Sequence, residues 1–352
     1  MKRRIFIQQS SLAGLGLVTL GPRSPQPEPP VSEFAKTLKP VGRALELEGY
    51  YVWCNTPIIG PDDKVHVFFS RWDAKKKMSG WINGCEIVHA VADTPESNFE
   101  VTGTILKPRP GYWDATTCHN PFITFFNGKY YLYYMGNSNG KTNTKRIGLA
   151  IADTINGPWQ RFDEPLLQPG ETGRWDDHCT TNPSVTYHNQ KYFLYYKSWN
   201  TRDYESASGP IRGNRKYGLA IADHPEGPFK KYEGNPVIDF SKRGNNAQLE
   251  DAFVWHENKR FYMLARDMGY YNHEYGIIMN ARDGKKWSNP AIAFYPADKY
   301  IKQPAAPAHL SRYGRFERPQ LLLKNGKPIY LFTASQGGKF MTASSFIFKI
   351  DG

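Results

Sequence analysis

Carboxylates and an imidazole stand in short polar motifs that are spread along the chain. Glu250 and Asp251 are adjacent, Glu317 stands two residues before a proline, and His119 precedes Asn120. A carboxylic acid and a carboxylate that face one bond can donate and accept protons, and an imidazole can do either near neutral pH. These residue types favour acid–base chemistry if the fold brings them together.

The polar motifs recur at a regular interval, roughly every 65 residues, which is typical of a repeat architecture. Each motif precedes an apolar run rich in β-branched and aromatic residues. Because like charges at one place raise each other's pKa and cost stability, collected carboxylates indicate chemistry rather than structure. The five motifs are Cys54-Asn55-Thr56-Pro57, Cys118-His119-Asn120-Pro121, Thr181-Asn182-Pro183, Glu250-Asp251-Ala252 and Glu317-Arg318-Pro319.

A second apolar segment follows each motif after about ten residues, often across an Asn-Gly turn of the hairpin type. A third segment is copied almost exactly in two units, as Gly148-Leu149-Ala150-Ile151-Ala152-Asp153 and Gly218-Leu219-Ala220-Ile221-Ala222-Asp223. Four strands per unit without helical periodicity predict an all-β, five-bladed β-propeller with four-stranded blades around a central channel. A β-sandwich would not repeat one four-strand pattern five times. We expect residues 31–352 to form this single domain, with the stretch near Ala44 to Tyr51 closing the ring.

The first strand of each propeller blade lines the channel, so the motifs are predicted to meet at one face. The second strand returns to that face, and its end should form the rim of a pocket. Arginines, amides and tryptophans there suit sugar hydroxyls, acidic substituents and sugar faces. The predicted cluster is His119, Asn120, Asn182, Glu250, Asp251, Glu317 and Arg318, and the predicted rim includes Arg71, Trp72, Asp73, Trp199, Arg266 and Asp267.

With these motifs the chain resembles the five-bladed propeller glycoside hydrolases of families 43 and 117 and their relatives, over residues 45–352. The resemblance implies that Glu317, in Glu317-Arg318-Pro319, is the general acid. It implies that Asp251 tunes the acid and orients the substrate, although Ala252 replaces the usual proline. It also implies inversion for most members, with an Asp as general base. That position falls on Asn120, and an amide cannot accept the proton.

The general base must therefore come from another residue, and the sequence leaves several alternatives open. Asp114 and Asp177 stand in Trp-Asp turns, Asp73 stands on the predicted rim, and His119 has a suitable intrinsic pKa. Trp-Asp turns also serve as structural punctuation in such blades. We take Glu317, Asp251, His119, Asp177 and Asp73 as the candidate catalytic residues.

The chain of 352 residues has a net charge of +12, from 45 Lys and Arg against 33 Asp and Glu, without a long basic run or a nucleic-acid motif. No apolar stretch approaches the roughly 20 residues of a membrane helix, so no stable membrane insertion is expected. Residues 1–30 read as an export signal and a Pro-rich linker. Arg3-Arg4 before Ile5-Phe6-Ile7 resembles a bacterial twin-arginine signal, which predicts a periplasmic or extracellular protein.

Cys54, Cys118 and Cys179 precede the channel motifs in near-equivalent places, which favours small buried residues over a disulfide framework. With Cys85 they number four, an even number that an exported protein could pair. Zinc would suit the thiols chemically, but the usual ligand spacing is missing, so no metal site is assigned. No cofactor is required, and the resemblance leaves room for a structural cation in the channel.

The resulting prediction is an exo-acting, inverting glycosidase that removes a terminal sugar from plant or algal oligosaccharides or polysaccharides. Insertions after the second strands, notably Thr201 to Lys216, should wall off a pocket. Arg71, Arg266 and Arg318 hint at an acidic or sulfated sugar. The alternatives are a lyase on uronic substrates and a propeller that binds glycans without cleaving them. The sequence gives no indication of the oligomeric state.

Overall fold

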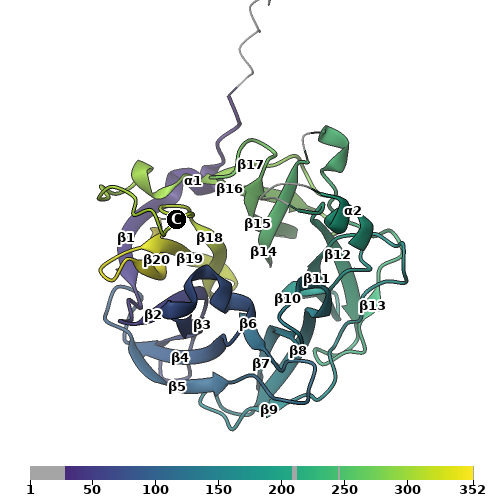
Figure 1. The fold of residues 1–352 in the computed structure, drawn as a ribbon, viewed down its shortest axis with the longest axis horizontal. Helices are drawn as coiled ribbons and strands as arrows, with labels where there is room; N and C mark the ends of the chain where they lie inside the picture. The colour runs from purple at the N-terminus through teal and green to yellow at the C-terminus, as the bar shows by residue number, and fades with distance from the viewer. Residues whose placement is uncertain (1–27, 208–211, 245, 352) are drawn as a thin grey trace, which may run out of the picture.

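The computed structural model describes residues 28–207, 212–244 and 246–351. Residues 1–27, nearly all of the predicted export segment, lie outside the described residues. No helix in the described part of the chain is long and apolar enough to cross a membrane. Figure 1 shows β-sheets set around a common centre, with the innermost strand of each sheet nearest that centre.

Three of the sheets are four-stranded and antiparallel, and each is formed by consecutive segments of the chain. Their strand order follows the sequence, as in a meander. The long strands carry the apolar and aromatic residues that predicted them. The three sheets comprise β6 (Thr117–Phe126), β7 (Lys129–Asn137), β8 (Arg146–Ala152) and β9 (Gln160–Arg161); β10 (Thr181–His188), β11 (Lys191–Ser198), β12 (Lys216–Ala222) and β13 (Lys230–Lys231); and β14 (Gln248–Glu257), β15 (Arg260–Met268), β16 (Gly276–Ala281) and β17 (Ala291–Phe294).

A fourth sheet joins the two ends of the chain and has eight strands. Its two antiparallel halves meet in one parallel pair, Tyr51 with Ala343. Each half therefore resembles one of the four-stranded sheets. The halves are β2 (Tyr50–Ile59), β3 (Val65–Asp73), β4 (Glu86–Ala92) and β5 (Glu100–Leu106), and β18 (Glu317–Lys324), β19 (Lys327–Gly337), β20 (Thr342–Ile350) and β1 (Leu38–Ala44).

The outer strand of the last half comes from the N-terminal side, as expected, but from an earlier segment than predicted. β1 pairs with β20 from Leu38 with Ile350 to Ala44 with Ser345. The predicted stretch from Ala44 to Tyr51 is instead mainly the connection to β2, since Leu45 and Gly49 have positive φ and interrupt an extended strand. The pairing of β1 with β20 joins the two ends of the described chain (Figure 1).

Helices are few and short in the described chain. The insertion between β11 and β12 includes α2, which begins after Asn200. The Asn200 side chain accepts a hydrogen bond from the Asp203 backbone N–H at the N-cap. The helices are α1 (Glu33–Thr37), α2 (Thr201–Ser206), and the 3₁₀ segments η1 (Ala74–Ile82), η2 (Thr142–Thr144), η3 (Ser241–Arg243) and η4 (Ala297–Lys299).

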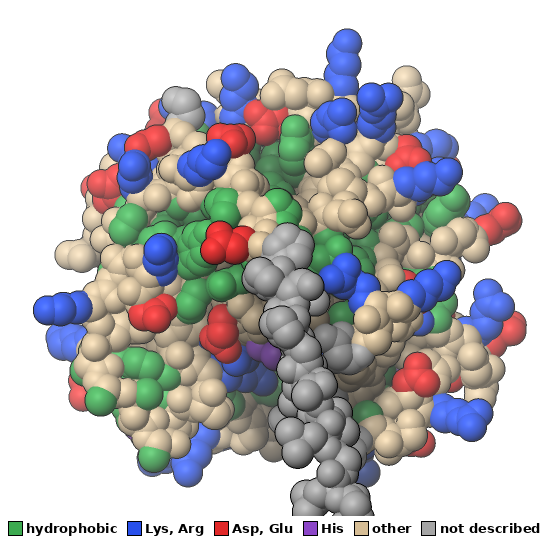
Figure 2. All heavy atoms as spheres, turned by 90° about the horizontal axis from the view of Figure 1, so that it is seen from above, with side chains coloured by type: hydrophobic (Ala, Val, Ile, Leu, Met, Phe, Trp, Pro, Cys, Tyr) green, Lys and Arg blue, Asp and Glu red, His purple; other side chains and the backbone are tan. Residues whose placement is uncertain are grey.

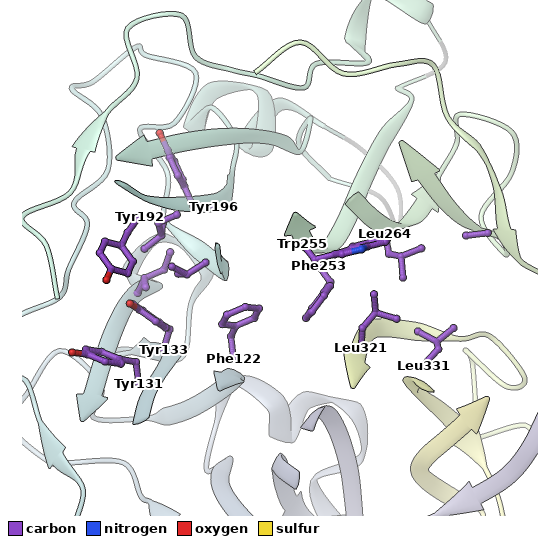
Figure 3. Close-up of a cluster of buried hydrophobic side chains, with 14 of the residues drawn as sticks. Phe122, Tyr131, Tyr133, Tyr192, Tyr196, Phe253, Trp255, Leu264, Leu321 and Leu331 are labelled. Atoms are coloured by element: carbon purple, nitrogen blue, oxygen red, sulfur yellow. The ribbon is translucent and has the colours of Figure 1, made fainter. Parts of the chain in front are cut away.

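Aromatic side chains fill the space between neighbouring sheets. Phe122 of β6 and Phe253 of β14 point toward each other across the centre, with ring centroids 5.7 Å apart (Figure 3). Tyr133 and Tyr196 are fully buried in the same cluster. Burial of such large side chains is the main favourable contribution to packing, so the aromatic richness of the sequence serves the contacts between sheets.

The innermost strand of each four-stranded group contains the same irregularity near its start. The pairing register shifts there in β2, β6, β10, β14 and β18, as in a β-bulge. One residue at each shift has φ between +52° and +63°, which is uncommon outside glycine. These residues are Cys54, Asn120, Asn182, Asp251 and Arg318. The repeated distortion turns equivalent side chains toward the common centre, and such strain is often found at functional sites.

Candidate active site

A cavity of about 210 Å³ lies where the starts of the innermost strands meet. It is lined by eight of the residues predicted from the sequence, together with cations and aromatic side chains that were not predicted. The predicted group is His119, Asn120, Asn182, Trp199, Glu250, Asp251, Glu317 and Arg318. The channel motifs therefore do converge on one site.

The floor of the cavity is a chain of hydrogen bonds between the five bulge residues, which we call the floor ring: Cys54, Asn120, Asn182, Asp251 and Arg318. The Cys54 thiol donates to Asn120 Oδ1 at 3.0 Å, and Asn120 Nδ2 donates to Asn182 Oδ1 at 2.8 Å. Asn182 Nδ2 donates to Asp251 Oδ1 at 2.8 Å, which also accepts from Arg318 Nη1 at 2.9 Å. Each bond joins a different pair of sheets, so the ring fixes the floor of the site.

The floor ring also bears on the expectation of a structural cation. Its single carboxylate, Asp251, is already paired with the guanidinium of Arg318. A metal ion at this level would compete with Arg318 for that carboxylate and would be repelled by its charge. The described residues also contain no group of three or more His, Cys, Asp or Glu placed to hold a metal. The floor ring therefore does not fit a cation.

Glu317 begins β18 above the floor ring and is almost fully buried. Its Oε2 lies 3.1 Å from Arg266 Nη1 and 3.3 Å from Arg312 Nη1. Its Oε1 is 3.7 Å from Arg315 Nη1 and has no hydrogen-bond partner among the described residues. One oxygen of the predicted general acid is therefore held and the other remains available for a hydrogen bond.

Glu250 lies near the start of β14 in the neighbouring sheet and faces three cations. It pairs with Lys197, with Arg215 Nε at 3.4 Å and with Arg266 Nη1 at 3.5 Å. Burial by itself would raise the pKa of Glu250. The positive charges of Lys197, Arg215 and Arg266 outweigh burial and hold this pKa well below its ordinary value. Glu250 is thus an ionised carboxylate that shares the atom Arg266 Nη1 with Glu317.

His119 lies in the cavity wall, with both ring nitrogens near thiols. Cys85 Sγ is 3.3 Å from Nδ1 and Cys54 Sγ is 3.7 Å from Nε2. Burial lowers the pKa of His119 well below its ordinary value, and the positive charges of Arg318, Lys145 and Lys197 lower it further. A neutral imidazole of this kind accepts a proton weakly, which counts against His119 as the general base.

The other proposed bases lie outside the cavity because each has local structural partners. Asp177 accepts from the backbone N–H of Thr201 at 2.6 Å and of Gly173 at 2.8 Å. Asp73 is exposed and caps η1 through the Lys75 N–H at 2.8 Å. Asp114 is fully buried and pairs with Arg109 and Arg161. These carboxylates stabilise turns and sheet packing instead of meeting at the site.

Most of the predicted rim is also turned away from the cavity. Arg71 pairs with Glu86 and lies over the Tyr50 ring, and the fully buried Trp72 donates to Lys77 O at 2.7 Å. Asp267 accepts three backbone N–H bonds within its own turn, and its pKa is nevertheless raised by burial. Arg266 contacts both Glu250 and Glu317 from behind. Only Trp199 lines the cavity itself.

The most important residues that the sequence reasoning missed are basic. The described cavity residues include six cations, of which only Arg318 was predicted, against the three carboxylates Glu250, Asp251 and Glu317; the other five are Lys145, Lys197, Arg212, Arg215 and Arg312. A signal for two of them was present: Lys145-Arg146 and Arg215-Lys216 occupy equivalent places before the copied third strands. On the outer face seen in Figure 2, by contrast, Lys and Arg are interspersed with Asp and Glu. Positive charge is therefore in excess inside the cavity.

All four cysteines are buried and free of disulfides in the described chain. Burial raises the pKa of Cys54 and of Cys118 to about 12, which keeps both thiols protonated at neutral pH. This agrees with the expected small buried residues around the axis, and a disulfide framework was the weaker reading.

Buried carboxylates that face a cavity at the meeting point of blade-like sheets define the class: this is a glycoside hydrolase. The chain belongs to the family described by the glycosyl hydrolases family 32 N-terminal domain, whose sequence model matches residues 119–301. The motifs had suggested families 43 and 117, and the match to family 32 supports the same broader class of propeller glycosidases.

Solved structures share the fold at low sequence identity. Zg3597, a family 117 glycoside hydrolase from the marine bacterium Zobellia galactanivorans, has a TM-score of 0.64 at 20% identity, over 88% of each chain. CoXyl43, a family 43 β-xylosidase/α-arabinofuranosidase from a compost microbial metagenome, has a TM-score of 0.58 at 15% identity, over 91% of this chain and 94% of its own. A family 43 enzyme from Xanthomonas citri has a TM-score of 0.54 at 15% identity, over 89% and 91%. No curated protein sequence matches the chain.

Proposed function

We propose that residues 31–352 form a five-bladed β-propeller that removes a terminal, negatively charged sugar from plant or algal oligosaccharides with inversion. The five antiparallel four-stranded groups, together with the pairing of β1 with β20, support the closed five-bladed arrangement. The basic N-terminus with Arg3-Arg4 supports export through a twin-arginine signal to the periplasm or the cell exterior.

The observation that carries the proposed chemistry is that Glu250 and Glu317 share Arg266 in one cavity. Glu317 is the general acid, because it stands in the matching motif, lines the cavity and has in Oε1 an oxygen without a hydrogen-bond partner among the described residues. Glu250 takes the place of the missing Asp as an ionised carboxylate that orients the water, because it is the only other carboxylate outside the floor ring among the described residues that line the cavity. Its lowered pKa makes it, like His119, a weak proton acceptor. Asp251 is a positioning residue, which holds Arg318 and Asn182 in the floor ring.

Glu317 lies within ion-pair distance of the guanidinium groups of Arg266, Arg312 and Arg315. An anionic substrate would balance part of this positive charge. The excess of cations over carboxylates in the cavity supports such a substrate. The enzyme should therefore act on uronic or sulfated sugars and poorly on neutral ones.

The exo mode is supported by the insertion that follows β11. Tyr204 and Arg212 of this insertion line the cavity, so the insertion forms part of its wall. A walled pocket accommodates the end of a chain better than its middle. Inversion needs room for a water between the carboxylates, which corresponds to a separation of about 6.5–9.5 Å. The anomer released first, followed by proton NMR, tests the stereochemistry.

Product analysis tests the function as a whole. Purified mature protein and its Glu317→Gln variant would be incubated with neutral, uronic and sulfated oligosaccharides. We expect a free monosaccharide from charged substrates, with kcat reduced by about 10²–10⁴ in the variant because the amide cannot protonate the leaving group. Glu233→Gln is the matched control, since Glu233 is exposed and remote from the cavity.

Two other outcomes would replace this proposal. An unsaturated product that absorbs ultraviolet light would identify elimination by a lyase. Saturable sugar binding without any product would identify a glycan-binding propeller. Full activity of Glu317→Gln with an unchanged pH profile would remove Glu317 from the acid role.

A further inference from the structure

Lys145 is a buried cavity residue that the proposed acid–base chemistry does not use. It stands directly before β8, where its backbone O accepts from the Thr180 N–H at 3.2 Å. Only 3% of the residue is exposed, yet it lines the cavity. Its ammonium group therefore projects into the substrate space from a fixed backbone position.

The ammonium of Lys145 lies between two indole rings. Nζ is 4.3 Å from the centroid of Trp199 and 5.6 Å from that of Trp81. Indole faces attract a cation but offer no hydrogen-bond acceptor to its three N–H donors. Every Asp and Glu side chain of the sequence lies among the described residues, and none forms an ion pair with Lys145. The ammonium thus lacks a carboxylate partner among the described residues.

The neighbouring groups do not supply the missing negative charge. Glu250 is a carboxylate whose charge acts on Lys145, and it is already shared by Lys197, Arg215 and Arg266. Burial raises the pKa of the Cys179 thiol, so this group stays neutral. Burial lowers the pKa of His119 well below its ordinary value and that of His178 to about 4, so neither ring adds charge near neutral pH.

We propose that Lys145 is the receptor for the anionic substituent of the bound sugar, a carboxylate or a sulfate ester. This inference rests on the proposed function. Both groups accept several hydrogen bonds and carry the charge that the site lacks. The Trp81 and Trp199 rings hold the ammonium in place before the sugar arrives. Lys145 is thus the specificity residue that distinguishes charged sugars from neutral ones.

The receptor has a built-in dependence on pH. Burial, aided by the charges of Lys197 and Arg215, lowers the pKa of Lys145 to about 7, although the charge of Glu250 opposes this shift. An anion binds the protonated amine, so its affinity should fall as the pH rises through about 7. The arginines of the cavity remain charged throughout this range.

Anion binding can be measured without knowledge of the sugar. The probes are inorganic sulfate and acetate, added to the full-length mature protein at constant ionic strength, with the fluorescence of the cavity tryptophans as the signal. We expect saturable binding that is about 10- to 100-fold weaker in Lys145→Met, in line with the loss of a charged hydrogen bond. Methyl sulfate, which carries the single charge of a sulfate ester, is then compared with acetate: tighter binding of methyl sulfate favours a sulfate ester as the substituent, and tighter binding of acetate a uronate.

Two variants separate the receptor role from a general defect. Lys145→Arg keeps the charge, so binding should persist at about pH 9, where the wild type has lost it. Lys141→Met removes an exposed lysine from the same loop and should bind as the wild type does. The proposal is overturned if neither anion binds saturably, or if Lys145→Met binds them as well as the wild type. Cleavage of neutral sugars without anion binding would contradict the receptor role of Lys145 but not the proposed hydrolysis. Anion binding without cleavage of any sugar would contradict the proposed hydrolysis but not the receptor role.

Discussion

The two sides of the cavity differ in how their charges are compensated. On the side of β14 and β18, Glu250 and Glu317 are bound to arginines and a lysine, with Arg266 common to both. On the side of β8, Lys145 faces indoles and has no carboxylate partner. A network of paired charges is rigid, whereas the charge of an uncompensated ammonium can be balanced by a bound anion. The comparison separates the chemistry of the site from its selectivity.

The largest effect on stability is expected on the compensated side, from Glu250→Gln. Removal of this carboxylate leaves Lys197, Arg215 and Arg266 without their shared partner, so we expect a loss of about 3–5 kcal/mol in the free energy of unfolding. Urea denaturation measures it. Glu257→Gln is the control, because Glu257 lies at the far end of the same strand. If Glu250→Gln lost no more free energy of unfolding than Glu257→Gln, the network would not be needed for stability.

The pH dependence of this loss has a definite sign. The folded state holds the pKa of Glu250 well below its ordinary value. The ionised side chain therefore contributes fully to the free energy of unfolding above the unfolded pKa of about 4.3. The contribution is lost as the pH falls toward the folded pKa. The wild type should therefore lose stability on acidification more steeply than Glu250→Gln, and parallel curves would contradict this account.

A smaller effect of opposite direction is expected from Lys145→Met. Replacing a buried, unpaired ammonium by an apolar side chain should raise the free energy of unfolding by about 1–3 kcal/mol at about pH 6. The folded pKa of about 7 lies below the ordinary 10.5, so the unfolded chain binds more protons between these values. The wild type then gains stability as the pH rises, and the advantage of the variant should shrink toward pH 10.5. Thermal unfolding across this range tests the sign, and a destabilised variant at pH 6 would show that Lys145 is compensated after all.

The smallest effects belong to carboxylates outside both sides of the cavity. Asp177→Asn should cost about 1 kcal/mol, because its two backbone hydrogen bonds are weakened, and should change kcat/KM by less than about twofold. Asp73→Asn should change stability by less than about 0.5 kcal/mol, since asparagine is also a good N-cap. A large loss of activity in either variant would return that residue to the catalytic set.

Repetition in the sequence explains which parts of the molecule could be predicted. The motifs at Asn120, Asn182, Asp251 and Arg318 occupy equivalent bulges, so alignment of the repeats was enough to place them at one floor. The ends of the second strands carry no such constraint. Asp177, Asp73 and Asp267 accept hydrogen bonds from N–H groups of their own turns, and these short-range bonds compete with any role at the cavity.

The basic side of the cavity was harder to predict because charge alone does not reveal a partner. Lys145 and Arg215 hold equivalent positions before the same copied strand. Arg215 forms an ion pair with Glu250 and donates a hydrogen bond to Gln248. Lys145 instead lies against aromatic rings. The difference comes from contacts between sheets, since Glu250 and Trp199 approach from other repeats. A repeat pattern predicts the position of each residue in its blade but not which residue it meets across the cavity.

The floor ring also has a consequence for the order in which the enzyme is made. Its members extend from Cys54 to Arg318, and each bond requires two sheets that are synthesised at different times. Domains generally begin to fold as the chain emerges from the ribosome. The early sheets could form during synthesis, but Asp251 cannot pair with Arg318 until that residue has been synthesised. The floor ring is therefore completed only near the end of translation, and a chain cut short before β18 would contain most of the sheets without a complete cavity floor.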